Sequence, residues 1–195
     1  MKSIHKLSDI AKKDPHSAFA AVSRSLQNEW KYIQRVVEES ADSFLSLRSA
    51  LSLHFLPQIS GYEINDFDAN LMMRPSRFCG IGIQDPVKIA ALSLDSSQQA
   101  SELLQQAIIS GEPVDIFAHN EHSKNIACKF KKMEEEETLK EVKILLQEIP
   151  IERKEQQQHL TNILNNKCSA WLAASPWEDE YFSMTPDEFR DSMAL

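Results

Sequence analysis

The sequence predicts an all-α protein, an irregular helical bundle with one short extended glycine-rich joint and one long charged helical arm. Apolar residues recur every three or four positions through most of the 195 residues, which is the spacing of one face of an α-helix. The chain holds only four glycines, and each stands between two such periodic segments. In one short stretch, Ile81 and Ile83 alternate with glycine, which predicts a short extended segment or tight loop.

Two helices are expected before residue 40. The first covers 3–13, and Asp14-Pro15 supplies the N-cap and first position of the second. The second covers about 15–38. It carries the clearest apolar stripe of this half, which consists of Ala18, Val22, Leu26, Trp30, Ile33 and Val37.

Two more helices are expected before the joint. One covers 41–56 and ends at Leu56-Pro57, with a turn at Gly61; its apolar residues are Phe44, Leu47, Leu51 and Phe55. A shorter one covers about 64–73 and carries Phe67 and Leu71.

The segment Arg74–Pro86, RPSRFCGIGIQDP, predicts a rigid non-helical joint between two helical halves. Gly80 and Gly82 have a backbone freedom that is unfavourable inside a helix, and Pro75 cannot continue one. Asp85 and Pro86 fit the N-cap and first position of the following helix. That helix is expected to be short, with Asp95 capping a longer one that closes at Gly111.

The arm, residues 119–166, is rich in charge. Its core, KFKKMEEEETLKEVKILLQEI, contains no glycine or proline and has one thin apolar stripe. We expect a protruding helix or one arm of a helical hairpin, kinked or broken by Pro150. The run Glu134–Glu137 is interpreted as a solvated face, because it is short and flanked by lysines.

The tail, residues 168–195, is dense in aromatic residues. Thr185-Pro186-Asp187-Glu188 predicts a helix start with a capping box. The chain stops while that helix is still apolar, so we expect a fragment rather than a finished protein. The aromatic residues are Trp171, Trp177, Tyr181, Phe182 and Phe189.

Composition excludes several classes of protein. The net charge is −8 and no segment is strongly basic, which argues against an autonomous nucleic-acid binder. Three distant cysteines indicate free thiols in a reducing compartment, and no apolar run is long enough to span a membrane. We therefore expect a cytoplasmic or nuclear protein without a membrane partner.

Few residues suggest chemistry, and we expect no catalytic residue, cofactor or metal. His119, His122 and Cys128 are the only candidate metal ligands, but a fourth ligand and the usual spacing are missing. Asp66 and Asp68 stand near a helix start, where acidic residues favour the helix dipole, rather than on a strand hairpin. At the joint, Arg74, Arg77 and Lys88 could contact a phosphate backbone. The alternative, that Arg77 caps carbonyls or pairs with Asp85, stays open.

Three separated stretches together resemble one family, the proteins of invertebrate non-LTR retrotransposons, in the part that follows the reverse-transcriptase palm. The first stretch resembles a family helix that reads Pro-x-Ala-Ala-Tyr-Ala-Ala and is followed by Trp-x-Tyr-x-x-Arg; the matching residues are Pro15, Ala18, Phe19, Ala20, Ala21, Trp30, Tyr32 and Arg35. It also resembles the Phe-Ile-Pro ending of the next family helix, through Phe55, Leu56, Pro57 and Gly61. The joint matches through Pro75, Arg77, Gly80, Ile81, Gly82, Ile83, Asp85 and Pro86, with Arg74 where Leu is usual and Cys79 where Gly is usual. The tail matches through Ser169, Ala170, Trp171, Leu172, Ala174, Pro176, Phe182, Glu188, Phe189, Arg190 and Asp191.

The resemblance implies a non-catalytic fragment. Residues 1–86 would be a thumb-like helical bundle ending in the joint, and residues 87–195 a helical linker with the arm and aromatic tail. In the parent protein these parts would position template–primer RNA or DNA and bridge the polymerase to a downstream endonuclease. Arg35 then joins Arg74, Arg77 and Lys88 as an expected nucleic-acid contact. The alternative of another class is a stand-alone α-helical protein–protein interaction module.

Overall fold

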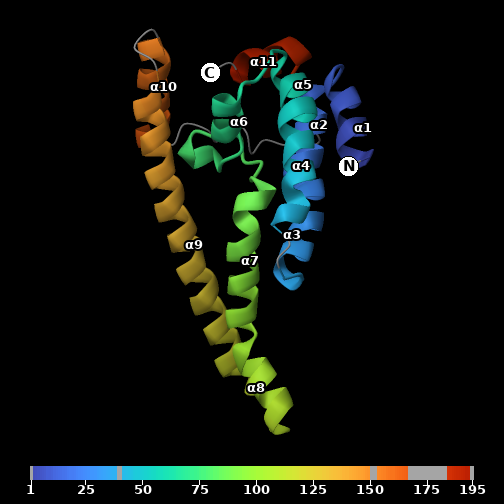
Figure 1. Ribbon diagram of the computed structural model, residues 1–195, viewed down its shortest axis with the longest axis vertical. Helices are drawn as coiled ribbons and strands as arrows, with labels where there is room; N and C mark the ends of the chain where they lie inside the picture. Colours follow the sequence, from blue (N-terminus) through green and yellow to red (C-terminus); the bar gives the residue numbers. More distant parts are fainter. Residues whose placement is uncertain (1, 39–40, 150–152, 167–183, 194–195) are drawn as a thin grey trace.

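The computed structural model describes residues 2–38, 41–149, 153–166 and 184–193. Within them, helices and short connections make up the whole structure and no strand is present, so the expected all-α class is confirmed. Figure 1 shows an elongated molecule in which α1–α5 form a bundle on one side, α9 forms the opposite side, and α7 lies between them.

The predicted helix 15–38 forms as one continuous helical run, but its buried face differs from the prediction. α2 (Pro15–Ala21) passes into a π-helical turn at Val22–Leu26 and then into α3 (Gln27–Val36). The π turn contains one residue more than an α-helical turn, so the residues after it are shifted by about one position around the helix axis. Gln27 and Gln34 are therefore buried beside Trp30, whereas the expected core residues Ile33 and Val37 are 46% and 45% exposed.

The end predicted at Leu56-Pro57 is wrong. α4 (Leu45–Ala50) continues through a second π turn at Leu51–Phe55 into α5 (Leu56–Ser60). Pro57 stands in the first turn after that π turn, where a residue without an N–H is tolerated. The run ends instead at Gly61, which has a φ of 81° and closes it in the left-handed conformation.

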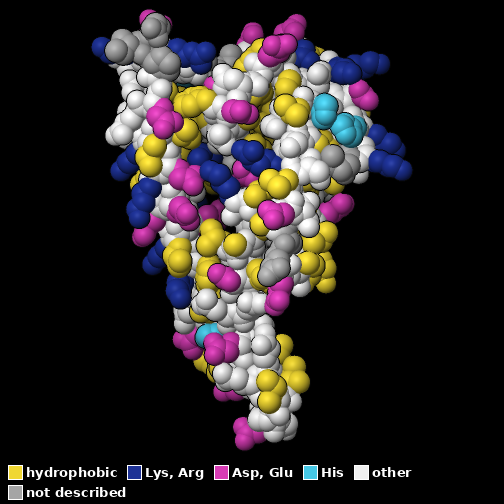
Figure 2. Space-filling model, viewed as in Figure 1, with side chains coloured by type: hydrophobic (Ala, Val, Ile, Leu, Met, Phe, Trp, Pro, Cys, Tyr) yellow, Lys and Arg dark blue, Asp and Glu magenta, His cyan; other side chains and the backbone are white. Residues whose placement is uncertain are grey.

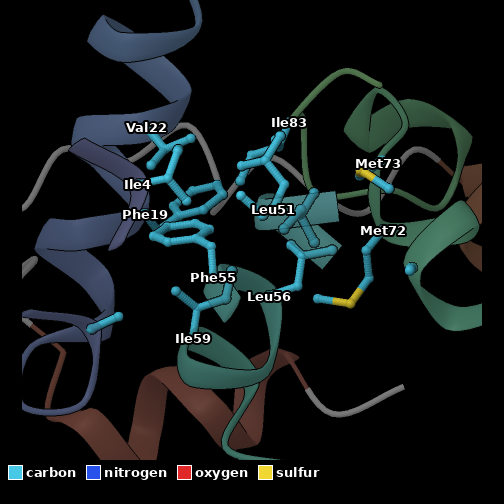
Figure 3. Close-up of a cluster of buried hydrophobic side chains, with 14 of the residues drawn as sticks. Ile4, Phe19, Val22, Leu51, Phe55, Leu56, Ile59, Met72, Met73 and Ile83 are labelled. Carbon is cyan, nitrogen blue, oxygen red and sulfur yellow. The ribbon is translucent and has the colours of Figure 1, made fainter. Parts of the chain in front are cut away.

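The main hydrophobic core lies among α1 (Lys2–Ala11), α2 and the α4–α5 run. Figure 3 shows Ile4, Phe19 and Val22 facing Leu51, Phe55 and Ile59. Two residues from far along the chain, Ile83 of the joint and Phe189 of α11 (Pro186–Met193), belong to the same cluster. The core thus contains residues from both sides of the division drawn at residue 86.

The helix after the joint is longer than predicted. α7 (Pro86–Ala100) runs through Asp95, which is exposed in mid-helix and is not the expected cap. The break comes at Ser101, and α8 (Glu102–Ser110) then ends at Gly111 in the left-handed conformation, as expected. Before the joint, α6 (Asp66–Met72) starts at Asn65, whose side chain accepts from the Asp68 amide.

The charged arm forms a helical hairpin. α9 (Ile116–Glu148) is a helix of 33 residues that ends shortly before Pro150, and α10 (Lys154–Asn166) returns along it. A second, smaller core holds the hairpin against the joint; its buried residues are Leu71, Cys79, Val142, Leu146, Ile149 and Leu160.

The capping box of the tail is confirmed. The Thr185 amide donates to Glu188 Oε2 at 2.8 Å, and the Glu188 amide donates to Thr185 Oγ1 at 3.3 Å. Phe189 is fully buried against α2, where its ring stacks on His16 at a centroid distance of 5.2 Å. Trp171, Trp177, Tyr181 and Phe182, and Cys168 before them, lie outside the described residues.

Candidate functional site

The joint interrupts the α-helices between α6 and α7, as predicted, but it is a compact turn with a short 3-10 helix and not the extended segment that was expected. A 3-10 turn at Ser76–Phe78 leads to Cys79, which has a φ of 65°. The backbone then turns back and crosses close to the end of α6: the Ile81 amide donates to the Met72 carbonyl at 2.9 Å, and the Gly82 amide donates to the Arg74 carbonyl at 2.8 Å. A Cβ on Gly80 would collide with the Arg74 carbonyl group, so this crossing requires glycine there.

Three of the four expected nucleic-acid contacts pair with glutamates of α9. Arg74 Nη1 lies 2.7 Å from Glu141 Oε2, and Lys88 Nζ lies 2.9 Å from the same oxygen. Arg77 Nη2 lies 2.7 Å from Glu135 Oε1. Arg74 is only 6% exposed, so its guanidinium serves this internal pair and is closed to a large ligand. Figure 2 shows basic and acidic side chains side by side where α9 passes the joint.

These pairs correct the interpretation of Glu134–Glu137 as a solvated face. Only Glu136 and Glu137 are exposed, whereas Glu135 pairs with Arg77 and Glu134 accepts from Gln84 Nε2 at 3.2 Å. Burial raises the pKa of Glu134, although Arg77 and Lys31 oppose that shift. For Glu141 burial also acts to raise the pKa, but the hydrogen bonds from Lys88 and Arg74 outweigh it and lower the pKa.

Asp85 caps α7 as predicted, and it pairs with a residue that the sequence did not indicate. Its Oδ1 accepts from the Val87 amide at 3.0 Å, while Arg48 Nε lies 2.8 Å from its Oδ2. The alternative partner considered for Asp85, Arg77, is therefore wrong. Arg48 also donates to Asn70 Oδ1 at 2.8 Å and so ties α4 to both α6 and α7. No local pattern marks Arg48, because its partners stand 22 and 37 positions away.

The fourth expected contact, Arg35, lines a cleft among α3, α7 and α9. The cleft has a volume of about 480 Å³. Lys31, Tyr32 and Asn28 of α3 share this wall, and Lys131 and Glu134 line the opposite wall on α9. Ile89, Leu92 and Phe130 give the cleft an apolar lining. Arg35 and Lys131 are exposed and make no ion pair among the described residues.

The charge around this cleft is locally positive, in contrast to the chain as a whole. Lys31, Arg35 and Lys131 line it together with one carboxylate, Glu134. Lys31 is half-buried; burial lowers its pKa, Glu134 opposes that shift, and Arg35 adds to it. Tyr32 is 69% exposed, so an aromatic face stands beside the cations. The spacing Lys31-Tyr32-x-x-Arg35 on one side of a helix is the sequence signal for this wall of the cleft, of which only Arg35 is expected as a nucleic-acid contact from the sequence.

The candidate metal ligands do not assemble. His122 Nε2 lies 2.9 Å from the carbonyl oxygen of Gln99, where it links α9 to α7, and Cys128 is exposed. Over the described ranges, no three His, Cys, Asp or Glu side chains are grouped so that they could hold a metal ion. Asp66 and Asp68 occupy the first turn of α6, the position expected for acids at a helix start.

Comparison with known proteins gives no match: no family model, no curated protein and no solved structure is significantly similar to this chain. Among the described residues, no helix has the length and apolar character needed to cross a membrane.

Proposed function

We propose that this chain is a non-catalytic helical module from the region that follows the polymerase palm in a retrotransposon reverse-transcriptase-like protein. In this proposal it acts in the cytoplasm or nucleus, and the cleft among α3, α7 and α9 holds a segment of template or primer backbone. One observation carries the proposal: Lys31, Arg35 and Lys131 line the same cleft as the exposed ring of Tyr32.

The chemistry of the cleft suits a nucleic acid. Lysine and arginine side chains contact phosphates, and an exposed aromatic ring stacks on bases without regard to sequence. Asn28, Ser93 and Ser96 add hydrogen-bonding groups to the walls. The proposal reassigns the expected contacts. Arg35 stays a ligand contact, while Arg74 and Arg77 of the joint and Lys88 of α7 pair with the arm.

The test is binding to a primer–template RNA/DNA duplex over a salt series. Removing one cation that neutralises a phosphate should reduce the slope of log K against log salt by about 0.7–0.9. The double variant Arg35→Gln/Lys131→Gln should therefore lower the slope by about 1.5 and weaken binding at low salt. Lys143→Gln is the matched control, because Lys143 is an exposed lysine of α9 that does not line the cleft.

Absence of binding at low salt, or an equal slope for the double variant and the control, would refute the proposal. Primer extension by the chain alone would refute its non-catalytic character. The second candidate, an α-helical protein–protein interaction module, is favoured by a different surface, at the end of the molecule formed by α8.

A further inference from the structure

The end of the molecule formed by α8 and the first turn of α9 exposes an unusual amount of apolar surface. Ile108, Ile109, Ile116 and Phe117 are 71%, 86%, 70% and 79% exposed. Figure 1 shows this end extending beyond the bundle, and Figure 2 shows hydrophobic side chains gathered over α8. Scattered single apolar residues are ordinary on a protein surface, but four within ten positions at one tip indicate a contact surface.

α8 itself lacks the burial that normally stabilises a short helix. It has nine residues, and none of them is buried. An isolated helix of this length is marginal in water, because helices shorter than about 12–15 residues depend on packing of an apolar face. A partner laid along α8 would supply that packing.

The charges around this tip determine which partner fits. No Lys or Arg stands between Lys88 and Lys124, and the acidic residues in that interval are all exposed: Asp95, Glu102, Glu112, Asp115 and Glu121. A second copy would set one acidic rim against another. Nucleic acid and anionic lipid would be repelled for the same reason. A partner with positive charge around an apolar face is complementary on both counts.

We propose that the tip, defined as residues 102–121, is a docking surface for a basic amphipathic helix of a partner protein. The apolar face of that helix would cover Ile108, Ile109 and Phe117, in the helix-to-apolar-surface mode of recognition. Its lysines and arginines would lie toward Glu112 and Glu121. This proposal is independent of the nucleic-acid cleft, which lies among other residues of α3, α7 and α9.

The probe is a fluorescein-labelled Lys/Leu peptide of about four helical turns, patterned so that leucines occupy one face. A scrambled peptide of equal composition and a Glu/Leu peptide of the same pattern serve as probe controls. Fluorescence anisotropy should show that the patterned Lys/Leu helix binds the full chain at least tenfold more tightly than either control, and that binding weakens with added salt.

Substitutions then locate the binding. Ile109→Ser/Phe117→Ser should weaken binding of the patterned peptide at least tenfold, and Glu112→Gln/Glu121→Gln should weaken it about threefold and reduce its salt dependence. Leu53→Ser is the matched control, because Leu53 is a 67% exposed apolar residue outside the tip, and it should bind as wild type does. Unchanged helical circular dichroism shows that each variant remains folded.

Four results would overturn the proposal. The first three are that the patterned peptide does not bind, that it binds no better than its scrambled form, and that it binds the Ile109→Ser/Phe117→Ser variant as tightly as the Leu53→Ser variant. The fourth is a concentration-dependent dimer in sedimentation that Ile109→Ser/Phe117→Ser dissociates, which would make the tip an interface between copies of this chain. A chain that fails to bind duplex in the salt series can still pass this test, so the two proposals fail separately.

Discussion

Replacing Glu141 with glutamine is the most informative single perturbation of the arm. Glu141 Oε2 accepts from both Arg74 and Lys88, and it is the only ion-pair partner of either cation among the described residues. Glu141→Gln keeps the shape of the side chain and removes its charge. The Arg74 guanidinium, whose side chain is 7% exposed, is then left with a neutral partner in a poorly solvated place.

The expected loss of stability is about 2 kcal/mol. Removing one partner from a fully buried pair costs about 3–5 kcal/mol. Here the Glu141 side chain is 35% exposed and that of Lys88 is 49% exposed, so solvent screens part of the interaction and only the Arg74 half approaches the buried case. The charge-assisted hydrogen bond from Arg74 accounts for about 1.5–3 kcal/mol before that discount.

Urea unfolding followed by circular dichroism measures the effect, with Glu136→Gln as the matched control. Glu136 is exposed and unpaired among the described residues, so its change should stay within about 0.5 kcal/mol. The pKa of Glu141 is lowered in the folded state, so its contribution is fully present above the unfolded pKa, about 4.3, and is lost as pH falls through the folded pKa. Equal effects of the two variants at pH 7, or a difference between them that grows below about pH 4, would refute this reasoning.

The remaining predictions concern the joint and its neighbours. Gly80→Ala should destabilise the chain by more than about 3 kcal/mol, because the new Cβ would collide with the Arg74 backbone. Gly82→Ala should cost only about 1 kcal/mol, because the new Cβ would meet open space and only the φ of 82° is unfavourable; equal urea midpoints for the two variants would contradict this. Glu134→Gln should raise the free energy of unfolding above that of wild type at pH 7 and leave it unchanged below about pH 4. The folded state raises the pKa of Glu134, so the stability that the protonated carboxyl contributes is lost as pH rises through the folded pKa. A thiol reagent at pH 8, read by peptide mass spectrometry, should modify exposed Cys128 quickly and Cys79 only on unfolding, because burial raises the pKa of Cys79 to about 11.

The sequence by itself determined the helical class and several helix ends. Asp14, Asp85 and Thr185 cap helices as expected, and Gly111 ends α8 as expected, whereas Gly61, expected only as a turn, ends the α4–α5 run in place of Leu56-Pro57. These outcomes depend on a few neighbouring residues, since a cap or a left-handed turn is a local hydrogen-bonding and steric event.

Tertiary structure decided which faces are buried and which charges are used. The π turn at Val22–Leu26 moved burial from Ile33 to Gln34, whose Nε2 donates to the Pro86 carbonyl 2.6 Å away. Glu141 pairs with Arg74 across 67 positions, and Arg48 pairs with Asp85 across 37. The sequence spacing of charged residues does not show which of them will pair over long distances. These pairs form only because packing of the apolar faces brings α9 against the joint.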